Sequence, residues 1–121
     1  MATGVAFASA ARTTAQTGTV VNKEVTDRGI IVYLNVGTAS GTGGLSVKIN
    51  GIDPVSGTAA QLNANPTAVT ATGVKTYILY PGTTSGGTQA TSAPLPDQFR
   101  IDVGVGDSSS YTYSVGYETI R

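Results

Sequence analysis

Alternation of apolar and polar residues is the clearest pattern in this chain of 121 residues. Side chains of a β-strand point alternately to the two sides of a sheet, so a period of two predicts strands with one buried and one solvated face. Residues 29–36 are almost continuously apolar and predict a central strand. The alternation is strongest in three segments: 45–53 (Leu-Ser-Val-Lys-Ile-Asn-Gly-Ile-Asp), 99–105 (Phe-Arg-Ile-Asp-Val-Gly-Val) and 111–117 (Tyr-Thr-Tyr-Ser-Val-Gly-Tyr).

Turn-forming residues divide the rest of the chain into short segments. Proline and glycine follow the strands at Asp53-Pro54, at Asn65-Pro66 and at Pro81-Gly82, which is typical turn chemistry. Weaker alternation predicts an edge strand over 12–21 and further strands within 59–63 and 68–80, whereas 83–96 reads as a long loop. Residues 97–105 and 110–120 predict a hairpin joined by 106–109. We therefore expect a single-domain, all-β, antiparallel β-sandwich of the jelly-roll or Ig-like kind, with about seven to eight short strands.

The first residues do not follow the alternation. Residues 1–11 are small and apolar, and Ala8-Ser9-Ala10 resembles a signal-peptidase site. However, a secretory signal also needs a basic segment before a longer apolar one. We therefore interpret 1–11 as a flexible N-terminal arm that lies on a neighbouring molecule, and 12–121 as the β-sandwich domain.

Composition narrows the classes of function. Charged residues make up 12% of the chain, about half the usual share of roughly 25%. Seven basic and seven acidic residues cancel, so the net charge gives no reason to expect nucleic acid or an acidic membrane surface as a partner. The sequence has no Cys and no His, so it lacks disulfides, thiolate ligands and the commonest general base. Its apolar runs are shorter than the roughly 20 residues that span a bilayer.

Candidate chemistry has a structural interpretation in each case. The glycine-rich 40–44 segment leads into a strand, and Lys48 follows too late for a phosphate-binding loop. Asp102 and Asp107 lack the ligand spacing of an EF-hand, so structural roles are favoured over a calcium site. The serines at 108–110 have no His to activate them, and no pair of acids stands in a distinctive context for glycoside hydrolysis. We expect no enzyme activity, no cofactor and no metal.

Tyrosine is the main aromatic residue, with six copies against two of Phe. Tyr111, Tyr113 and Tyr117 share one face of the predicted last strand. They form either part of the core or a row that binds a sugar or a protein, and the alternation favours the core. Tyr33 lies on the polar face of a very apolar strand, so it is the better candidate for a partner contact.

Several motifs, in this order along the chain, resemble a family of small virion proteins from tailed bacteriophages. The likeness runs through most of the chain after about residue 12. It is carried by Arg-Thr-Thr-Ala-Gln-Thr-Gly-Thr from Arg12, Arg-Gly-Ile-Ile-Val-Tyr-Leu-Asn-Val from Arg28, Val-Lys-Ile-Asn-Gly-Ile-Asp-Pro-Val-Ser-Gly from Val47, Ala-Val-Thr-Ala-Thr-Gly from Ala68, Tyr-Ile-Leu-Tyr-Pro-Gly from Tyr77, Leu95-Pro96, Phe-Arg-Ile from Phe99 and Ser-Tyr-Thr-Tyr-Ser-Val-Gly-Tyr from Ser110.

The resemblance implies a β-sandwich accessory protein of the particle, most like a capsid decoration (cement) protein. Such a protein binds the outer surface of the head, commonly as a homotrimer, and bridges capsomers. The implied partners are the major capsid protein and other copies of this chain, with no nucleic acid and no membrane. The protein would be made in the host cytoplasm. We expect contacts from the arm, from Tyr33 and from the loops 37–44 and 83–96, with these candidates: Ala2, Thr3, Val5, Phe7, Tyr33, Thr42, Thr84 and Gln89.

A second hypothesis is a virion-surface or tail adhesion module that binds a host glycan. In that case Tyr33 and the loops 37–44 and 83–96 should gather into one exposed patch. A decoration protein instead predicts that the segment from Ala2 to Thr19 becomes ordered only against the capsid or a sister subunit. The two hypotheses therefore place the binding surface in different parts of the chain.

Overall fold

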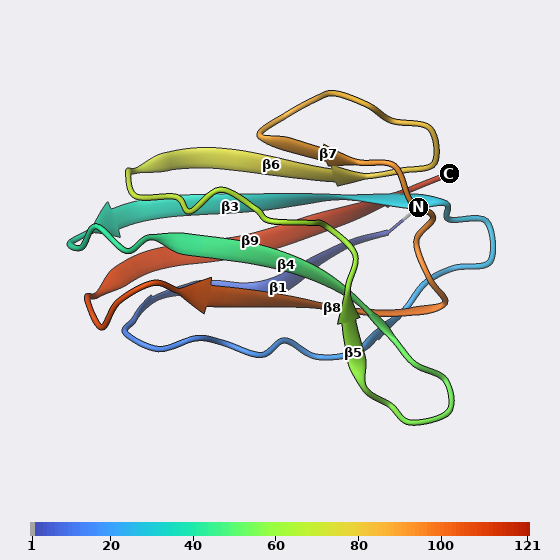
Figure 1. The fold of residues 1–121 in the computed structure, drawn as a ribbon, viewed down its shortest axis with the longest axis horizontal. Coiled ribbons are helices and arrows are strands. Elements are labelled where there is room, and N and C mark those ends of the chain that lie inside the picture. Colours follow the sequence, from blue (N-terminus) through green and yellow to red (C-terminus); the bar gives the residue numbers. More distant parts are fainter. Residues whose placement is uncertain (1) are drawn as a thin grey trace.

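The computed structural model describes residues 2–121, and its regular structure consists of β-strands (Figure 1). The described residues form nine strands. They are β1 (Thr3–Arg12), β2 (Val21–Asn22), β3 (Gly29–Ala39), β4 (Leu45–Ile52), β5 (Ala59–Gln61), β6 (Gly73–Leu79), β7 (Gln89–Thr91), β8 (Gln98–Val105) and β9 (Tyr111–Ile120).

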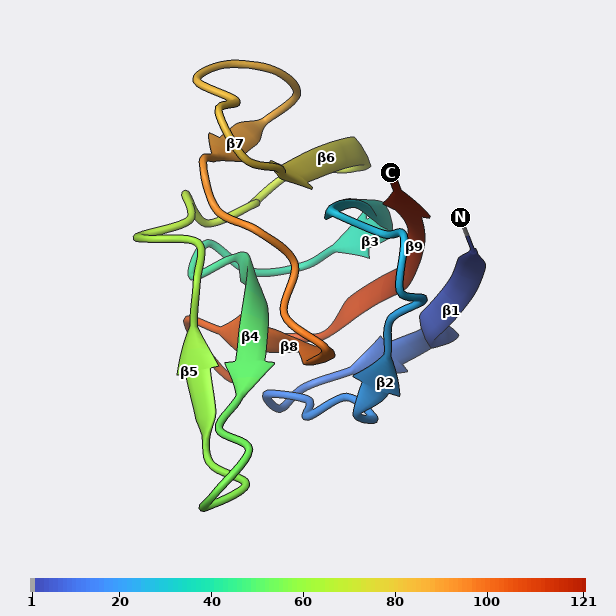
Figure 2. The same ribbon diagram turned by 90° about the vertical axis from the view of Figure 1, so that its right-hand side faces the viewer.

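The strands form two sheets, which we call sheets A and B. Sheet A has five strands in the order β1-β9-β3-β6-β7, and sheet B has four in the order β2-β8-β4-β5. Figure 2 shows the sheets curving toward each other so that β1 and β2 lie side by side, whereas β7 and β5 are far apart. The prediction of a single-domain all-β sandwich is confirmed.

The pairing of the strands distinguishes between the two kinds of sandwich expected. Apart from β7, the strands pair as a long antiparallel ribbon would when its halves are folded together: β1 with β9, β2 with β8, β3 with β6 and β4 with β5. This nesting of early strands with late ones is the topology of a jelly roll. Strand β7 is an addition that pairs in parallel with β6.

The core lies between the sheets and follows the alternation closely. Ile30, Val32 and Leu34 of β3 are completely buried, and the alternate residues of β4 and β8 in the same core are at most 2% exposed. Tyr111 and Tyr113 are also buried in the core, as the alternation favoured. Tyr117 is half-buried and packs against the edge of the core.

The predicted hairpin of the last two strands is wrong. Strand β8 pairs with β2 and β4 in sheet B, whereas β9 pairs with β1 and β3 in sheet A. The chain crosses between the sheets after β8, and there the connection is bonded to the β3–β4 loop, which crosses at the same end of the sandwich. The N–H of Gly43 donates to Asp107 Oδ2 (2.7 Å), and Ser40 Oγ donates to the carbonyl of Ser110 (2.6 Å). Alternation shows which side of a strand is buried, but it does not show which sheet the strand joins.

The expected flexible arm over residues 1–11 also needs correction. Met1 lies outside the described residues, but Thr3–Arg12 form β1 and pair with β9. The segment is fixed because Ala6 and Phe7 pack against the core, while Gly4 lies so close to the Tyr117 ring that a side chain there would overlap it.

Two other segments differ from the sequence-based boundaries. The edge strand expected over 12–21 is reduced to an isolated bridge between Gln16 and Val103, followed by the short β2. The loop expected over 83–96 contains β7. Neither difference changes the two-sheet architecture.

Candidate functional site

The most distinctive surface feature of the sandwich is its long edge strand. Sheet A ends in β1 and β7, and sheet B ends in β2 and β5. Strand β1 has 10 residues, whereas the other three edge strands have only two or three. An edge strand exposes unpaired N–H and C=O groups, which can pair with a strand of another molecule. The beginning of β1 is therefore the first place to look for a binding site.

The start of β1 is anchored on one side and open on the other. The N–H of Thr119 donates to the carbonyl of Ala2 (2.7 Å), and the N–H of Ala2 donates to Thr119 Oγ1 (2.8 Å). Thr3 is exposed, and Val5 keeps 72% of its accessible surface. The structure thus brings together Ala2, Thr3 and Val5, three of the residues predicted to contact a partner.

Phe7 was predicted as a contact but has a mainly internal role. Its ring packs against the core, and the guanidinium of Arg12 lies 5.5 Å from its centroid. The same guanidinium lies 4.7 Å from the centroid of Tyr113 and donates to the carbonyl of Tyr113 (2.9 Å). Phe7 therefore helps to fix β1 on the sandwich rather than offering a free side chain to a partner.

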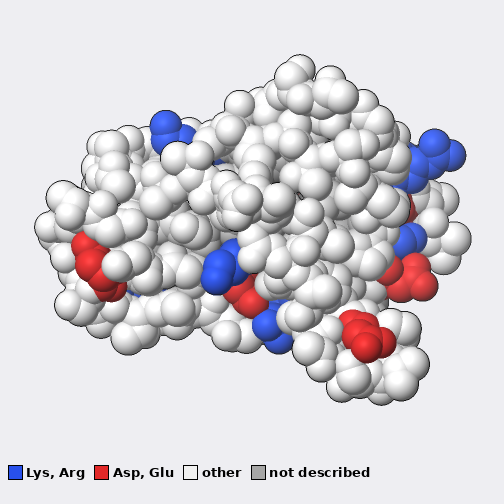
Figure 3. All heavy atoms as spheres, viewed as in Figure 1, with Lys and Arg blue, Asp and Glu red and all other residues white. Residues whose placement is uncertain are grey.

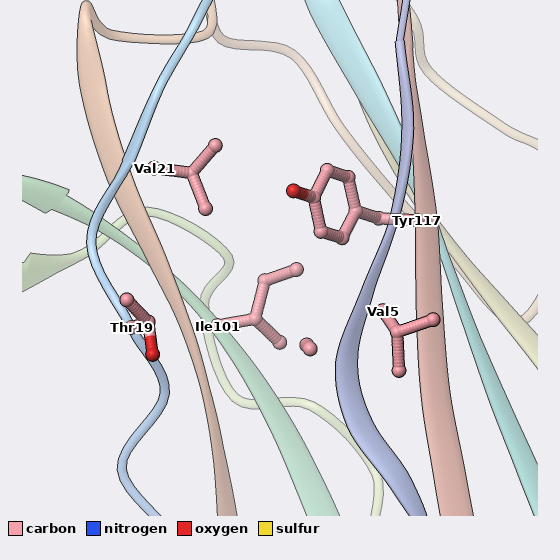
Figure 4. Close-up of a pocket in the computed structure, with 6 residues that line it drawn as sticks. Val5, Thr19, Val21, Ile101 and Tyr117 are labelled. Atoms are coloured by element: carbon pink, nitrogen blue, oxygen red, sulfur yellow. The ribbon is translucent and has the colours of Figure 1, made fainter.

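A small hollow separates the edge strands of the two sheets. Figure 4 shows Val21, Thr19 and Ile101 on one side of it and Tyr117 and Val5 on the other. Its volume is about 40 Å³. No pattern in the sequence predicts this hollow, because Thr19, Ile101 and Tyr117 come from three segments that are far apart in the chain.

The outer face of sheet A continues from this edge and carries very little charge. In its five strands the charged residues are Arg12, Lys75 and Glu118. Lys75 stands opposite Leu34, which is buried, so it does not belong to the outer face. Tyr33 lies on the outer face, and its hydroxyl donates to Glu118 Oε1 (2.6 Å). That hydrogen bond raises the pKa of Tyr33, and it partly satisfies the one carboxylate of this face.

The residues opposite each other across sheet A place Tyr33 in line with the open edge. Val5 of β1 stands opposite Gly116 of β9, which in turn stands opposite Tyr33 of β3. Because directly opposite residues share a face of the sheet, Val5 and Tyr33 belong to one surface with only a glycine between them. We call Thr3, Val5, Tyr33, Gly116 and Glu118 the β1 surface.

The remaining predicted contacts lie elsewhere. Thr42 is exposed in the loop after β3, at the end of the sandwich where that loop meets the β8–β9 connection. Thr84 is exposed in the loop after β6, which leaves the sheet from the opposite end of β3. Gln89 is not a free contact, because its side chain donates to the carbonyl of Ala64 (2.7 Å) and accepts from Asn63 Nδ2 (3.0 Å).

Charged groups elsewhere on the molecule are few and scattered (Figure 3). Asp102, considered above as a calcium ligand, accepts hydrogen bonds from Arg100, from Asn50 Nδ2 (2.8 Å) and from the N–H of Gly18 (2.9 Å). Asp107 accepts from backbone N–H groups of Gly43 and Ser109, and the bond from Gly43 is the main reason why its pKa is lowered. Both carboxylates therefore connect segments of the fold.

Within residues 2–121 no group of three or more His, Cys, Asp or Glu side chains is placed to hold a metal ion. In the same part of the chain no helix is long and apolar enough to cross a membrane. What the β1 surface offers is main-chain hydrogen bonding and apolar contact. The fold and this surface define the class as a jelly-roll domain with an open strand edge.

Comparisons of the chain with models of protein families, with curated proteins and with solved structures found no match.

Proposed function

We propose that this protein is a non-catalytic structural component of a tailed-phage particle, a capsid decoration (cement) protein that binds the outer surface of the head and bridges capsomers. Copies of the chain would assemble as a homotrimer, and the homotrimer would bind the major capsid protein. The sequence motifs given above and the jelly-roll topology, which recurs in viral capsid and lectin domains, support this proposal. Since one fold hosts many functions, the proposal depends on the surface more than on the topology.

The observation that carries the proposal is the open, uncharged start of β1 with the exposed Val5 beside it. A single small contact of this kind binds weakly. On a shell that repeats its binding sites many times, weak contacts become sufficient when each molecule bridges two subunits. Binding to the assembled shell alone then stabilises that shell by mass action.

The test is to add the purified protein to expanded heads that were assembled without it. We expect it to sediment with the heads, to appear in side-chain-resolution images on their outer surface, and to raise the temperature at which they open. Failure to bind expanded heads would overturn the proposal. So would images of intact particles in which the protein occurs only at the tail tip.

The glycan-binding alternative receives less support from the geometry. It requires Tyr33 and the loops 37–44 and 83–96 to form one patch. However, the loop after β3 is bonded to the β8–β9 connection at one end of the sandwich, and the segment after β6 starts from the other end and returns along β6 to Thr76. Thr76 stands opposite Tyr33 in sheet A, so Tyr33 and the returning segment are neighbours. The loop that follows Ala39 lies at the end of β3 and does not join them, so the three segments do not make one common patch.

A further inference from the structure

The hydrogen-bonding pattern of β1 identifies which of its main-chain groups are open. Neighbouring residue pairs in an antiparallel ladder alternate between those that exchange hydrogen bonds and those that do not. The N–H of Thr119 donates to the carbonyl of Ala2 (2.7 Å), which makes Ala2 a bonded position, so Thr3 and Val5 direct their N–H and C=O groups away from β9. Because β1 has β9 as its neighbour in sheet A, these groups face outward from the edge.

The later part of the same edge is closed. The pairing of β1 with β9 is irregular between Val5 and Phe7 and again between Phe7 and Ala10. Arg12 then bends back over the strand, and its guanidinium donates to the carbonyl of Ala8 (2.6 Å). Bulges and positively charged side chains are the usual means by which proteins block edge strands. Within the described residues, the segment before the first bulge is therefore the part of β1 that stays regular and has no hydrogen-bonded strand on its outer side.

The small hollow lies where an added strand would need space. A strand that pairs with Thr3 and Val5 would extend sheet A, and every second side chain would point toward sheet B. That direction leads to the hollow between Tyr117 on one side and Thr19 and Val21 on the other (Figure 4). Its volume of about 40 Å³ suits a small aliphatic side chain. Strand addition commonly combines such a side-chain pocket with main-chain hydrogen bonds.

We propose that the edge at Thr3–Val5 accepts an extended, uncharged segment of a shell subunit as an additional strand of sheet A, with a small aliphatic side chain in the hollow. The inference rests on the proposed function and specifies how the partner is bound. Charge supports it, because residues 2–11 are uncharged and the neighbouring Glu118 already accepts a hydrogen bond from Tyr33 (2.6 Å). Glu118 is the one charged side chain of the β1 surface, so a segment rich in charged residues would find few partners here.

A second copy of β1 fits this edge less well. If two copies of β1 paired antiparallel about Gly4, each Gly4 would stand opposite the other. The inward side of Gly4 faces Tyr117, and glycine has no side chain to fill the hollow there. Three ladder residues also bury far less than the roughly 1,200–2,000 Å² that a stable, specific interface needs. The edge therefore suits a segment that other contacts of the shell hold in place.

Val5→Pro tests the inference, with Val5→Ile as its matched control. Proline removes the N–H that points outward and leaves the bonds between β1 and β9 intact, whereas isoleucine keeps the N–H and an apolar, branched side chain. On expanded heads lacking the protein, we expect Val5→Pro to bind on the order of tenfold more weakly or worse. Val5→Ile should bind within about threefold of the wild type. Thermal unfolding of both variants verifies that they fold.

Hydrogen–deuterium exchange of the wild-type chain gives a second measurement that does not depend on a variant. On binding to heads, the amides of Thr3 and Val5 should become protected. Equal binding by a folded Val5→Pro variant, or binding without this protection, would overturn the inference and leave the decoration function standing. Absence of wild-type binding would instead overturn the function itself. If light scattering shows dimers of the free protein that Val5→Pro abolishes, the occupant is a second copy and the inference is wrong.

Discussion

Two buried tyrosines of the core differ in what their hydroxyl groups contact. The hydroxyl of Tyr111 donates to Asp107 Oδ1 (3.0 Å) and accepts from the N–H of Gly44 (2.9 Å). The hydroxyl of Tyr77 is buried and has no hydrogen-bond partner among the described residues, and burial raises its pKa. A buried hydroxyl stabilises the fold only when it is hydrogen-bonded.

Replacing each of these tyrosines by phenylalanine should therefore have different effects. Tyr111→Phe leaves the buried N–H of Gly44 without its acceptor, and we expect it to lower the free energy of unfolding by about 1–3 kcal/mol. Tyr77→Phe removes a hydroxyl that has no partner, so the free energy should stay the same or rise by up to about 1 kcal/mol. Urea unfolding at constant pH measures both. Equal losses in the two variants would contradict this explanation.

The β3–β4 loop and the β8–β9 connection form one unit because Asp107 bridges them. Hydrogen bonds from Gly43, Ser109 and Tyr111 lower its pKa from the ordinary value of 3.8. Since the folded-state pKa is below that of the unfolded chain, the stabilisation is present above the ordinary value and is lost as the pH falls through the folded-state value.

Asp107→Asn should reduce the dependence of stability on acid pH. We expect the variant to be less stable than the wild type near neutral pH and to lose less stability between about pH 5 and about pH 2. Some dependence should remain, because the pKa values of Asp27 and Asp53 are lowered too. Urea unfolding across this pH range measures the effect, and the same acid dependence in both proteins would show that Asp107 does not contribute.

The segment before β2 crosses β8 at a very short distance. A side chain at Gly18 would overlap the carbonyl of Ile101, and the N–H of Gly18 donates to Asp102 (2.9 Å). We expect Gly18→Ala to displace the segment and to cost about 1–3 kcal/mol.

Gly37→Ala is the control for Gly18→Ala, since the nearest atom to a side chain there is 3.8 Å away. It should change the free energy of unfolding by less than about 0.5 kcal/mol. Thermal unfolding compares the two variants. An equal loss of unfolding free energy in the two variants would mean that the short distance between Gly18 and Ile101 does not determine the cost of a side chain at Gly18.

The pattern of apolar residues in the sequence allowed β3, β4, β8 and β9 to be predicted, but not the equally long β1. Segments such as 29–36 and 45–53 alternate or are continuously apolar because one or both sides are buried. β1 was not predicted because its four alanines and one serine show no strong alternation, and its docking depends on Gly4 and Phe7 meeting β9. Because β1 was not recognised as a strand, Ala2, Thr3 and Val5 were predicted as contacts of a flexible arm and not as residues of a sheet edge.

At the scale of the whole molecule, the low charge has a consequence for binding. The net charge is zero, and the β1 surface has Glu118 as its one charged side chain. Attraction between exposed charges weakens with salt, because the screening length falls to roughly 3 Å at 1 M. Binding through main-chain hydrogen bonds and apolar contact lacks this dependence.

We therefore expect the affinity for heads to change by less than about threefold between about 0.05 and 0.5 M NaCl. Sedimentation of the protein with heads at several salt concentrations measures this. A steep loss of binding with salt would mean that charged groups outside the β1 surface make the main contact.

The order of the strands also determines when the domain is able to fold in the cell. Strand β9 follows all the other strands in the chain, yet it lies between β1 and β3 in sheet A. A ribosome adds roughly 5–20 residues per second, so β1 waits for several seconds until its neighbour has been synthesised. During this time the apolar strand β3 also lacks one of its partners. Sheet A is therefore completed only after the last strand has left the ribosome, and the nascent chain is most exposed to misassembly just before that moment.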